Sequence, residues 1–293
     1  MINTTQDVVE IMPANVGEEK NIMNNEIDYT DLLPQGCKKT VEILWTGGWN
    51  STFRVVELSR EDNIIIQPIY IIDPNRKSVE YEKRSMDNIV SALKRKPGTK
   101  AEIMPTVMYR LEEIPRDDNI SKAFHTIHAI TNLGSQHEWL AWLGKLHPNM
   151  EMCTEAGIPE TSHIIDAIER FCTLDIKDNI GHVNHEKSTE EGNLVLGWFT
   201  FPIITRTEVE MLQTIRDWGY EDVMKHIWFC HNPINGEPCG FCHPCDVKME
   251  SGMEWLLPLQ AQKNYKMHKR VERVLGKYVS HCWIKYQRRI QRK

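Results

Sequence analysis

Apolar and polar positions along the first third of the chain fall into blocks that predict strands and helices in turn. The apolar run 41–45 predicts a strand, and apolar positions at helical spacing follow it in 53–58. A longer apolar run, 64–72, is interrupted by Pro68. Because proline has no N–H for a strand ladder, the second strand is predicted to be confined to 69–72.

The same alternation continues beyond the second strand. Apolar positions recur at helical spacing in 86–93, and 101–104 predicts a third strand. This order of strands and helices is typical of a parallel sheet with right-handed crossovers. The sequence therefore predicts an α/β fold, with a Rossmann-like parallel sheet and flanking helices.

The middle of the chain has a mostly helical pattern, followed by a polar stretch and a late apolar run. Helices are predicted at 122–133, 139–146 and 164–171, a loop at 174–193, and a strand within 195–204.

The next helix carries clear boundary signals. Thr207 and Glu210 have the spacing of a capping box, in which each side chain bonds the other residue's backbone N–H. Apolar positions at helical spacing follow, and Gly219 is placed to end the helix. A helix is therefore predicted between Thr207 and Gly219.

The two ends of the chain carry opposite charge, although the net charge is only −6. Residues 1–36 hold seven acidic side chains and one lysine, and they predict a flexible acidic tail. Residues 261–293 hold eleven lysines and arginines and one glutamate, and they predict a basic helix or tail. The segment 37–260 is predicted to be the main domain.

Aromatic residues interleaved with the cations of the basic end would allow contact with nucleic acid through phosphates and base stacking. The favoured interpretation is an amphipathic helix that packs its apolar side chains on the body, and pairing with the acidic tail is a further alternative. The aromatic residues are Tyr265, Tyr278, Trp283 and Tyr286, and the apolar ones are Val271, Val274, Leu275 and Val279.

The sequence lacks the marks of a secreted or membrane-spanning protein. It has no run of about 18 uncharged apolar residues, and its start lacks the basic and apolar regions of a secretory signal. Four of the eight cysteines lie between 230 and 245, which in a reducing compartment indicates metal binding rather than disulfides. A cytoplasmic protein without membrane contact is expected.

The segment 46–52 has the residues of a phosphate-binding loop. It reads Thr-Gly-Gly-Trp-Asn-Ser-Thr and lies between the first predicted strand and helix. Backbone N–H groups at a helix start converge on an anion, and the two glycines let a phosphate approach closely. The segment matches neither the P-loop of kinases nor the dinucleotide-binding fingerprint. A plain connecting turn is the alternative.

Four cysteines predict a metal site. Cys230, Cys239, Cys242 and Cys245 are spaced so that four thiolates can close around one ion. Four thiolates without an open position are typical of structural tetrahedral zinc. An iron–sulfur cluster is the rival ligand, and unliganded cysteines or disulfides are the alternative to a metal.

These motifs, in this order, resemble the 7-cyano-7-deazaguanine synthase family. That family belongs to the PP-loop ATP pyrophosphatases, and it pairs an N-terminal S-G-G-x-D-S loop with a C-terminal zinc site of this cysteine spacing. The segment 202–209 is also similar to the family's stretch before the zinc site, with Arg206 in place of a lysine. The resemblance covers roughly 40–250 and is weak in 105–195.

Two positions of the loop depart from the family's motif. Thr46 replaces the serine and keeps a hydroxyl, whereas Asn50 replaces the aspartate and removes a negative charge. Loss of this carboxylate bears on the handling of Mg²⁺, which prefers oxygen ligands. Asn50 is therefore a candidate catalytic position at which the chain differs from the family.

The resemblance implies an ATP-dependent carbon–nitrogen ligase that uses Mg²⁺, carries structural Zn²⁺ and forms a homodimer. ATP would adenylate the carboxylate of 7-carboxy-7-deazaguanine, ammonia would displace AMP, and a second activation would dehydrate the amide to the nitrile. Arg206 would act catalytically by neutralising charge on the α-phosphate. Asp73 would contact the adenosine, although a charged residue there is also a common turn former. The implied ATP-binding residues are Thr46, Gly47, Gly48, Asn50, Ser51, Thr52 and Asp73.

Two other functions fit the same motifs. One is a PP-loop relative that adenylates a different carboxylate or amide, such as a modified nucleotide or a protein terminus. The other is an ATP-binding module without turnover. Only an enzyme would release pyrophosphate.

Overall fold

The computed structural model describes residues 38–291, so the predicted acidic tail 1–36 lies outside the described residues. Within 38–291, eight strands form one sheet in the order β3-β2-β1-β5-β8-β7-β6, and β4 also pairs with β2. The strands are β1 (Lys39–Leu44), β2 (Ile64–Ile72), β3 (Glu102–Ile103), β4 (Val107–Arg110), β5 (Met150–Glu151), β6 (Leu174–Lys177), β7 (Ile180–Val183) and β8 (Phe199–Phe201).

Every pairing among β1 to β5 and β8 is parallel, whereas β6, β7 and β8 pair antiparallel. The prediction of an α/β fold with a mostly parallel sheet and flanking helices is confirmed. The helices are α1 (Trp49–Ser59), α2 (Val79–Leu93), α3 (Asp118–Thr131), α4 (Gln136–Leu146), α5 (His163–Phe171), α6 (Glu190–Val195), α7 (Glu208–Trp218), α8 (Glu221–Met224), α9 (His243–Glu250) and α10 (Leu259–Gln291), with 3₁₀ turns η2 (Leu111–Glu113) and η3 (Glu254–Leu256).

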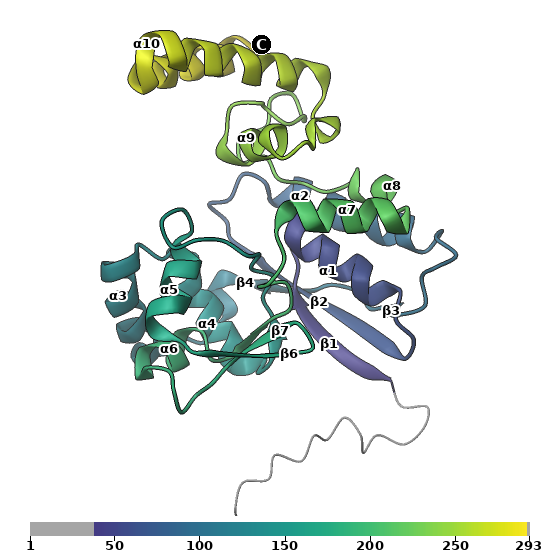
Figure 1. Ribbon diagram of the computed structural model, residues 1–293, viewed down its shortest axis with the longest axis vertical. Coiled ribbons are helices and arrows are strands. Elements are labelled where there is room, and N and C mark those ends of the chain that lie inside the picture. Colours follow the sequence, from purple (N-terminus) through teal and green to yellow (C-terminus); the bar gives the residue numbers. More distant parts are fainter. Residues whose placement is uncertain (1–37, 292–293) are drawn as a thin grey trace, which may run out of the picture. The chain divides into compact units, whose positions relative to one another are not determined.

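Side chains of β2 alternate between two hydrophobic cores, one on each face of the sheet. Ile66 and Tyr70 belong to the core that contains α1, α2, α7 and α8, whereas Ile69 and Ile71 belong to the core that contains α3 to α6. The two sets of helices lie on different sides of the sheet (Figure 1). Both faces are covered, as expected for the parallel part of a sheet.

The prediction that the second strand is confined to 69–72 is wrong, because β2 runs through Pro68. The Ile69 carbonyl accepts a hydrogen bond from the Trp45 N–H at 2.9 Å on the β1 side. The Pro68 nitrogen therefore faces the opposite side, because neighbouring residues of a strand point their backbone groups in opposite directions. There β3 has ended at Ile103 and β4 has not begun, so no ladder bond is lost.

The prediction of a loop at 174–193 is also wrong, since this segment contains the antiparallel hairpin β6–β7 and the start of helix α6. Asp178 and Asn179 form the two-residue turn, with φ of 51° and 65°. Positive φ at both positions matches the right-handed twist of the strands, and Asp and Asn tolerate it better than most residues. The strand predicted within 195–204 is present as β8, which has only three residues.

Helix α7 has the predicted ends. The Thr207 side chain accepts from the Glu210 N–H, and the Glu210 carboxylate accepts from the Thr207 N–H at 2.8 Å. Gly219 ends the helix with φ 71° in the left-handed region. The capping box and terminal glycine are therefore confirmed.

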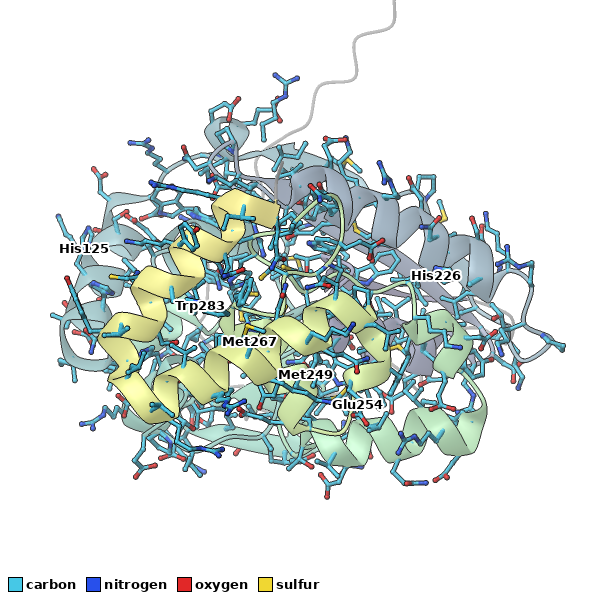
Figure 2. The ribbon with its side chains drawn as sticks, turned by 90° about the horizontal axis from the view of Figure 1, so that it is seen from above. His125, His226, Met249, Glu254, Met267 and Trp283 are labelled. Carbon is cyan, nitrogen blue, oxygen red and sulfur yellow. The ribbon has the colours of Figure 1, made fainter. Side chains whose placement is uncertain are left out.

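Helix α10 bends at Gly276, where φ is 81°, into two limbs (Figure 2). The limbs contact each other through a hydrogen bond from the Ser280 hydroxyl to the His268 carbonyl. The favoured interpretation of one helix packed on the body through its apolar side chains is wrong at Val274, Leu275 and Val279, which are 70%, 58% and 42% exposed. All three lie at or near the bend, where the chain turns back and leaves this tip in solvent. Within 38–291, no helix combines the length and apolar character needed to cross a membrane.

Candidate functional site

The order of the strands reverses beside β1. From β1 the chain passes to β2 on one side, and it later returns to β5 on the other side. In open α/β sheets, ligands bind in the crevice outside the carboxyl ends of the strands at such a reversal. The carboxyl ends of β1 and β5 therefore mark the first place to look for a site.

A cavity of 560 Å³ lies at this reversal. Its walls include residues at the ends of β1 and β2, the loop after β5, the start of α1, and the region around the cysteines. Side chains from α4 close another side. Small-molecule sites typically measure about 300–1,000 Å³, so the cavity can hold a nucleotide-sized ligand.

The loop between β1 and α1 is held by one glycine and opened toward the cavity by another. Gly47 has φ 69°, and a Cβ there would lie 2.6 Å from the Ser85 hydroxyl oxygen. Its carbonyl accepts a hydrogen bond from the Trp228 N–H at 2.8 Å. Gly48 caps α1 without a side chain, so no side-chain cap bonds the first N–H groups. These donors and the positive helix end can meet an anion.

The predicted ATP-binding residues of this loop divide into two groups. Thr52 is fully buried behind the loop, and its hydroxyl accepts a hydrogen bond from the Trp45 indole N–H at 3.0 Å. Gly47 shapes the turn from outside the cavity lining. The members that line the cavity are Thr46, Gly48, Asn50 and Ser51.

Asp73 lines a second hollow of 600 Å³ that adjoins the cavity. Its carboxylate accepts a hydrogen bond from the Asn75 N–H at 2.9 Å, which makes it a turn former in this structure. The two hollows have four lining residues in common: Arg76, Gln136, Trp139 and His231.

Arg206 is engaged elsewhere and lines neither hollow. Its guanidinium pairs with Glu57 at 2.9 Å, and Glu57 also accepts from Arg54 at 2.7 Å. Arg54 is buried and bonds both carboxylate oxygens of Glu151, at 2.9 and 2.7 Å. Burial acts to lower the pKa of Arg54, but the Glu151 hydrogen bonds and charge raise it overall. We call these four residues the α1–β5 ion-pair network.

A buried lysine that sequence patterns did not single out lines the cavity. Lys248 of α9 contacts the Glu208 carboxylate, and its ammonium lies 4.8 Å from the Trp49 ring centroid. Burial lowers the pKa of Lys248 to about 7, while the charge of Glu155 acts in the opposite direction. A lysine in a helix of mixed polarity gives no sequence signal of this environment.

Glu155, in the loop after β5, is a second cavity residue without a sequence signal. Burial raises the pKa of Glu155, whereas the charge of Lys248 and a hydrogen bond from the Asn50 side chain lower it. One carboxylate oxygen, Oε2, is buried and has no hydrogen-bond partner. We call Asn50, Glu155, Glu208 and Lys248 the cavity charge group.

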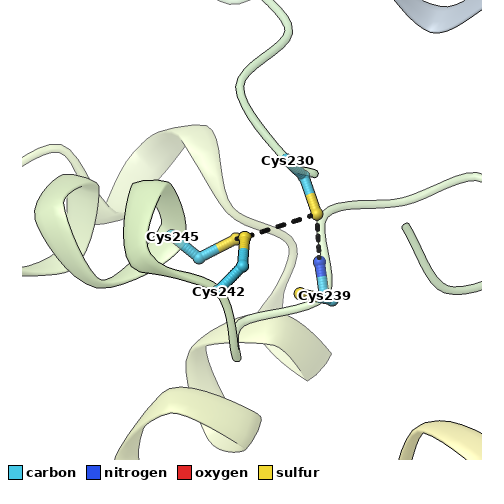
Figure 3. Close-up of side chains that lie close together, drawn as sticks. All are labelled: Cys230, Cys239, Cys242 and Cys245. Carbon is cyan, nitrogen blue, oxygen red and sulfur yellow. Dashed lines mark hydrogen bonds between the residues drawn. The ribbon is translucent and has the colours of Figure 1, made fainter. Parts of the chain in front are cut away.

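The four predicted metal-ligating cysteines lie together. Their sulfur atoms are all within 4.8 Å of one another and all four residues are buried. The Cys239 N–H donates to the Cys230 sulfur at 3.3 Å (Figure 3). Cys242 caps α9 and Cys245 lies in its first turn. This cluster could hold a metal ion such as zinc.

Helix α10 supports the cluster from outside. The Asn264 side chain donates to the Cys239 carbonyl at 2.9 Å, and the Arg288 guanidinium lies 3.8 Å from the Cys239 sulfur. The rings of Phe241 and Trp283 meet edge to face at 5.8 Å. Such surrounding contacts orient metal ligands and offset their negative charge.

The phosphate-type loop and the cysteine cluster, far apart in the sequence, contribute to one cavity wall. Cys230 and His243 line the cavity together with Gly48. Comparisons with protein-family models, curated proteins and solved structures gave no match for this chain. What the chain does is therefore inferred from its motifs and from the groups gathered at this cavity.

Proposed function

We propose that the chain is a PP-loop type enzyme that binds ATP in the cavity and activates a carboxylate by adenylation. The substrate is 7-carboxy-7-deazaguanine and the nitrogen donor is ammonia. One observation carries the proposal: the glycine loop presents the uncapped start of α1 to a cavity at the reversal of strand order.

The proposed reaction proceeds through adenylation, amide formation and dehydration of the amide. A carboxylate oxygen attacks the α-phosphorus, and the bond to pyrophosphate breaks. Ammonia then attacks the acyl carbon, AMP leaves, and an amide forms after loss of a proton. The amide oxygen then attacks the α-phosphorus of a second ATP, and pyrophosphate and one N–H proton leave. Loss of AMP and of the second N–H proton gives the nitrile.

Cations at the cavity would offset the charge that develops on the phosphates. Lys248 and Arg76 line the cavity, whereas Arg206 does not. Preorganised positive charge in a site that excludes water stabilises such transition states strongly. In the proposal Lys248 therefore takes the role that the sequence resemblance gave to Arg206.

The adjoining hollow suits the acceptor. Trp139 offers an aromatic surface for a planar heterocycle, and Arg76 offers a cation for its carboxylate. Both residues also line the first cavity, so a carboxylate beside Arg76 would face bound ATP.

The metals of the proposal have separate roles. Four thiolates without an oxygen donor favour zinc in a structural role. When bound with ATP, Mg²⁺ neutralises charge on the phosphates. The cytoplasmic location and the homodimer stay predictions, and nucleic-acid contact by the basic end stays the less favoured alternative.

Gly48 provides the test of the ATP site. A Cβ at Gly48 would lie 3.4 Å from the Thr46 hydroxyl oxygen and 3.7 Å from the Trp228 carbonyl oxygen, so the fold accommodates alanine. A phosphate bound on the loop would clash with this added methyl group. Calorimetric titration of Gly48→Ala should show ATP binding weakened at least about tenfold with an unchanged Tm. Gly157→Ala, with a comparable 3.4 Å contact away from the cavity, is the control.

Product analysis separates the proposed reaction from its alternatives. With ATP, Mg²⁺, ammonium and 7-carboxy-7-deazaguanine, we expect AMP, pyrophosphate and the nitrile. If AMP and pyrophosphate form only with a different acceptor, the proposed reaction class stands and the proposed substrate is wrong. ATP binding without turnover would favour the binding module, and absence of ATP binding would contradict the proposal.

A further inference from the structure

Three carboxylates of the described chain line the cavity, and two of them are fully engaged. Glu82 is held by hydroxyl donors and an arginine, and Glu208 by a lysine and a hydroxyl. The partners are Tyr70, Ser78 and Arg76 for Glu82, at 2.8, 2.6 and 3.2 Å, and Lys248 and Ser251 for Glu208.

Glu155 is the cavity carboxylate that keeps a free oxygen. Its Oε2 atom is shielded from solvent and accepts no hydrogen bond. A buried carboxylate oxygen without a donor is destabilising, and native proteins rarely leave one unless a ligand or ion completes it. Because Glu155 also lines the cavity, a cation bound there with ATP would offset the charge of this carboxylate.

The neighbour of Glu155 is the residue at which the phosphate-type loop is altered. Asn50 and Glu155 both line the cavity, and the Asn50 side chain acts to lower the pKa of the Glu155 carboxyl. Asn50 lies in the first turn of α1, two residues after Gly48. A carboxylate from the loop after β5 thus adjoins the place where the loop motif has lost its own.

We propose that Glu155 is a ligand of the divalent cation that accompanies ATP, and that Asn50 positions it. The inference rests on the proposed function. Mg²⁺ in nucleotide sites is typically held by one or two carboxylates together with phosphate oxygens and water. The free oxygen of Glu155, beside the phosphate-binding end of α1, meets that requirement.

The test compares ATP binding with and without a divalent cation. Calorimetry in EDTA and in Mg²⁺ gives the factor by which the cation tightens ATP binding. Glu155→Gln should lower this factor about tenfold by weakening ATP binding in Mg²⁺. Glu160→Gln, on the same loop but exposed and outside the cavity lining, should behave like the wild type.

Moving the carboxylate sharpens the test. Adding Asn50→Asp to Glu155→Gln places a carboxylate on α1 in place of the one lost at Glu155. It should restore most of the factor by which Mg²⁺ tightens ATP binding. Electron paramagnetic resonance of Mn²⁺ with ATP gives a readout that needs no turnover. Bound Mn²⁺ should appear in the wild type and the double variant, and decline in Glu155→Gln.

The outcomes separate this inference from the proposed function. If Glu155→Gln keeps the full cation effect while ATP binds, the inference is wrong and the ATP site stands. If ATP binds neither with nor without a cation, both fall. Should Glu155→Gln fail to fold, Asn50→Asp alone decides, because a second carboxylate beside Glu155 should tighten Mn²⁺ and an unchanged affinity would overturn the inference.

Discussion

Two groups of charged side chains flank helix α1, and they differ in how completely they are satisfied. In the α1–β5 ion-pair network, Arg54 bonds Glu151 through two nitrogens and Glu57 through a third. In the cavity charge group, Glu155 keeps a buried oxygen without a donor, and the nearby Trp49 indole N–H is also unpartnered. Saturated charges hold the sheet and α1 together, whereas unsaturated ones are available to a ligand.

The comparison also shows that a charged residue near a motif is not necessarily part of the site. Arg206 lies in a segment that resembles a catalytic stretch, yet its charge is neutralised by Glu57. Lys248 carries no such signal, yet it lines the cavity. Both cations have a carboxylate partner, Glu57 for Arg206 and Glu208 for Lys248, so what distinguishes them is whether the side chain lines the cavity.

Removing the metal should produce the largest effect and should act on only one of the two groups. Lys248 follows Cys245 by one turn of α9, while the α1–β5 network has no residue there. Structural zinc contributes about 10–16 kcal/mol in zinc-finger peptides, so chelation should unfold α9 and α10 and weaken ATP binding. Hydrogen exchange should rise in 230–291 and stay slow in α1.

Chelation should have the same effect on Cys172→Ser as on the wild type, since Cys172 lies outside the cluster. Unchanged exchange in α9 after complete metal removal would contradict a structural role for the cluster.

Breaking the α1–β5 network should have the next largest effect. Glu151→Ala leaves the buried Arg54 guanidinium without its main partner, which typically costs about 3–5 kcal/mol of unfolding free energy. Urea denaturation followed by circular dichroism measures it. Glu61→Ala, an exposed residue just after α1, should stay within about 0.5 kcal/mol of wild type. Equal effects of the two variants would remove the distinction between the groups.

The two loop glycines should separate stability from binding in the same way. Gly47→Ala forces a left-handed residue with a 2.6 Å clash and should lose at least about 1–2 kcal/mol of unfolding free energy. Gly48→Ala meets no such clash, and thermal unfolding should leave its Tm unchanged. A larger loss of stability in Gly48→Ala would show that the structural and ligand-facing roles are reversed.

The smallest expected effect is a pH dependence at Glu155. Burial raises the pKa of Glu155 above its ordinary 4.5, so the folded protein holds this proton more tightly than the unfolded chain. That stabilisation is present at lower pH and is lost as the pH rises through the folded-state pKa. Glu155→Gln should therefore gain stability relative to wild type as pH rises from 4.5 towards neutrality.

Urea denaturation at a series of pH values gives this difference, and Glu160→Gln should show no such trend. A difference that moves in the opposite direction would mean that Lys248 and Asn50 outweigh burial at Glu155.

Of the features that sequence reasoning missed, one carried a readable signal and the others did not. The Asp178-Asn179 turn of the β6–β7 hairpin is a pair of residues that tolerate positive φ, between two short runs. Pro68 has no N–H for a ladder bond, as its sequence implies. That its nitrogen faces the gap between β3 and β4, where no such bond is needed, depends on the placement of those strands. Glu155 and Lys248 gave no local signal, because their environment is made by distant segments.

Local patterns in the sequence suffice to predict the alternation of strands and helices in the first third, the ends of α7 and the cysteine cluster. These features depend on periodicity, capping and spacing within a few residues, which act locally. Which charges line the cavity depends on the packed fold, as Lys248 and Arg206 show. Burial and pairing depend on contacts between segments far apart in the chain, and these exist only once the sheet and its helices have packed.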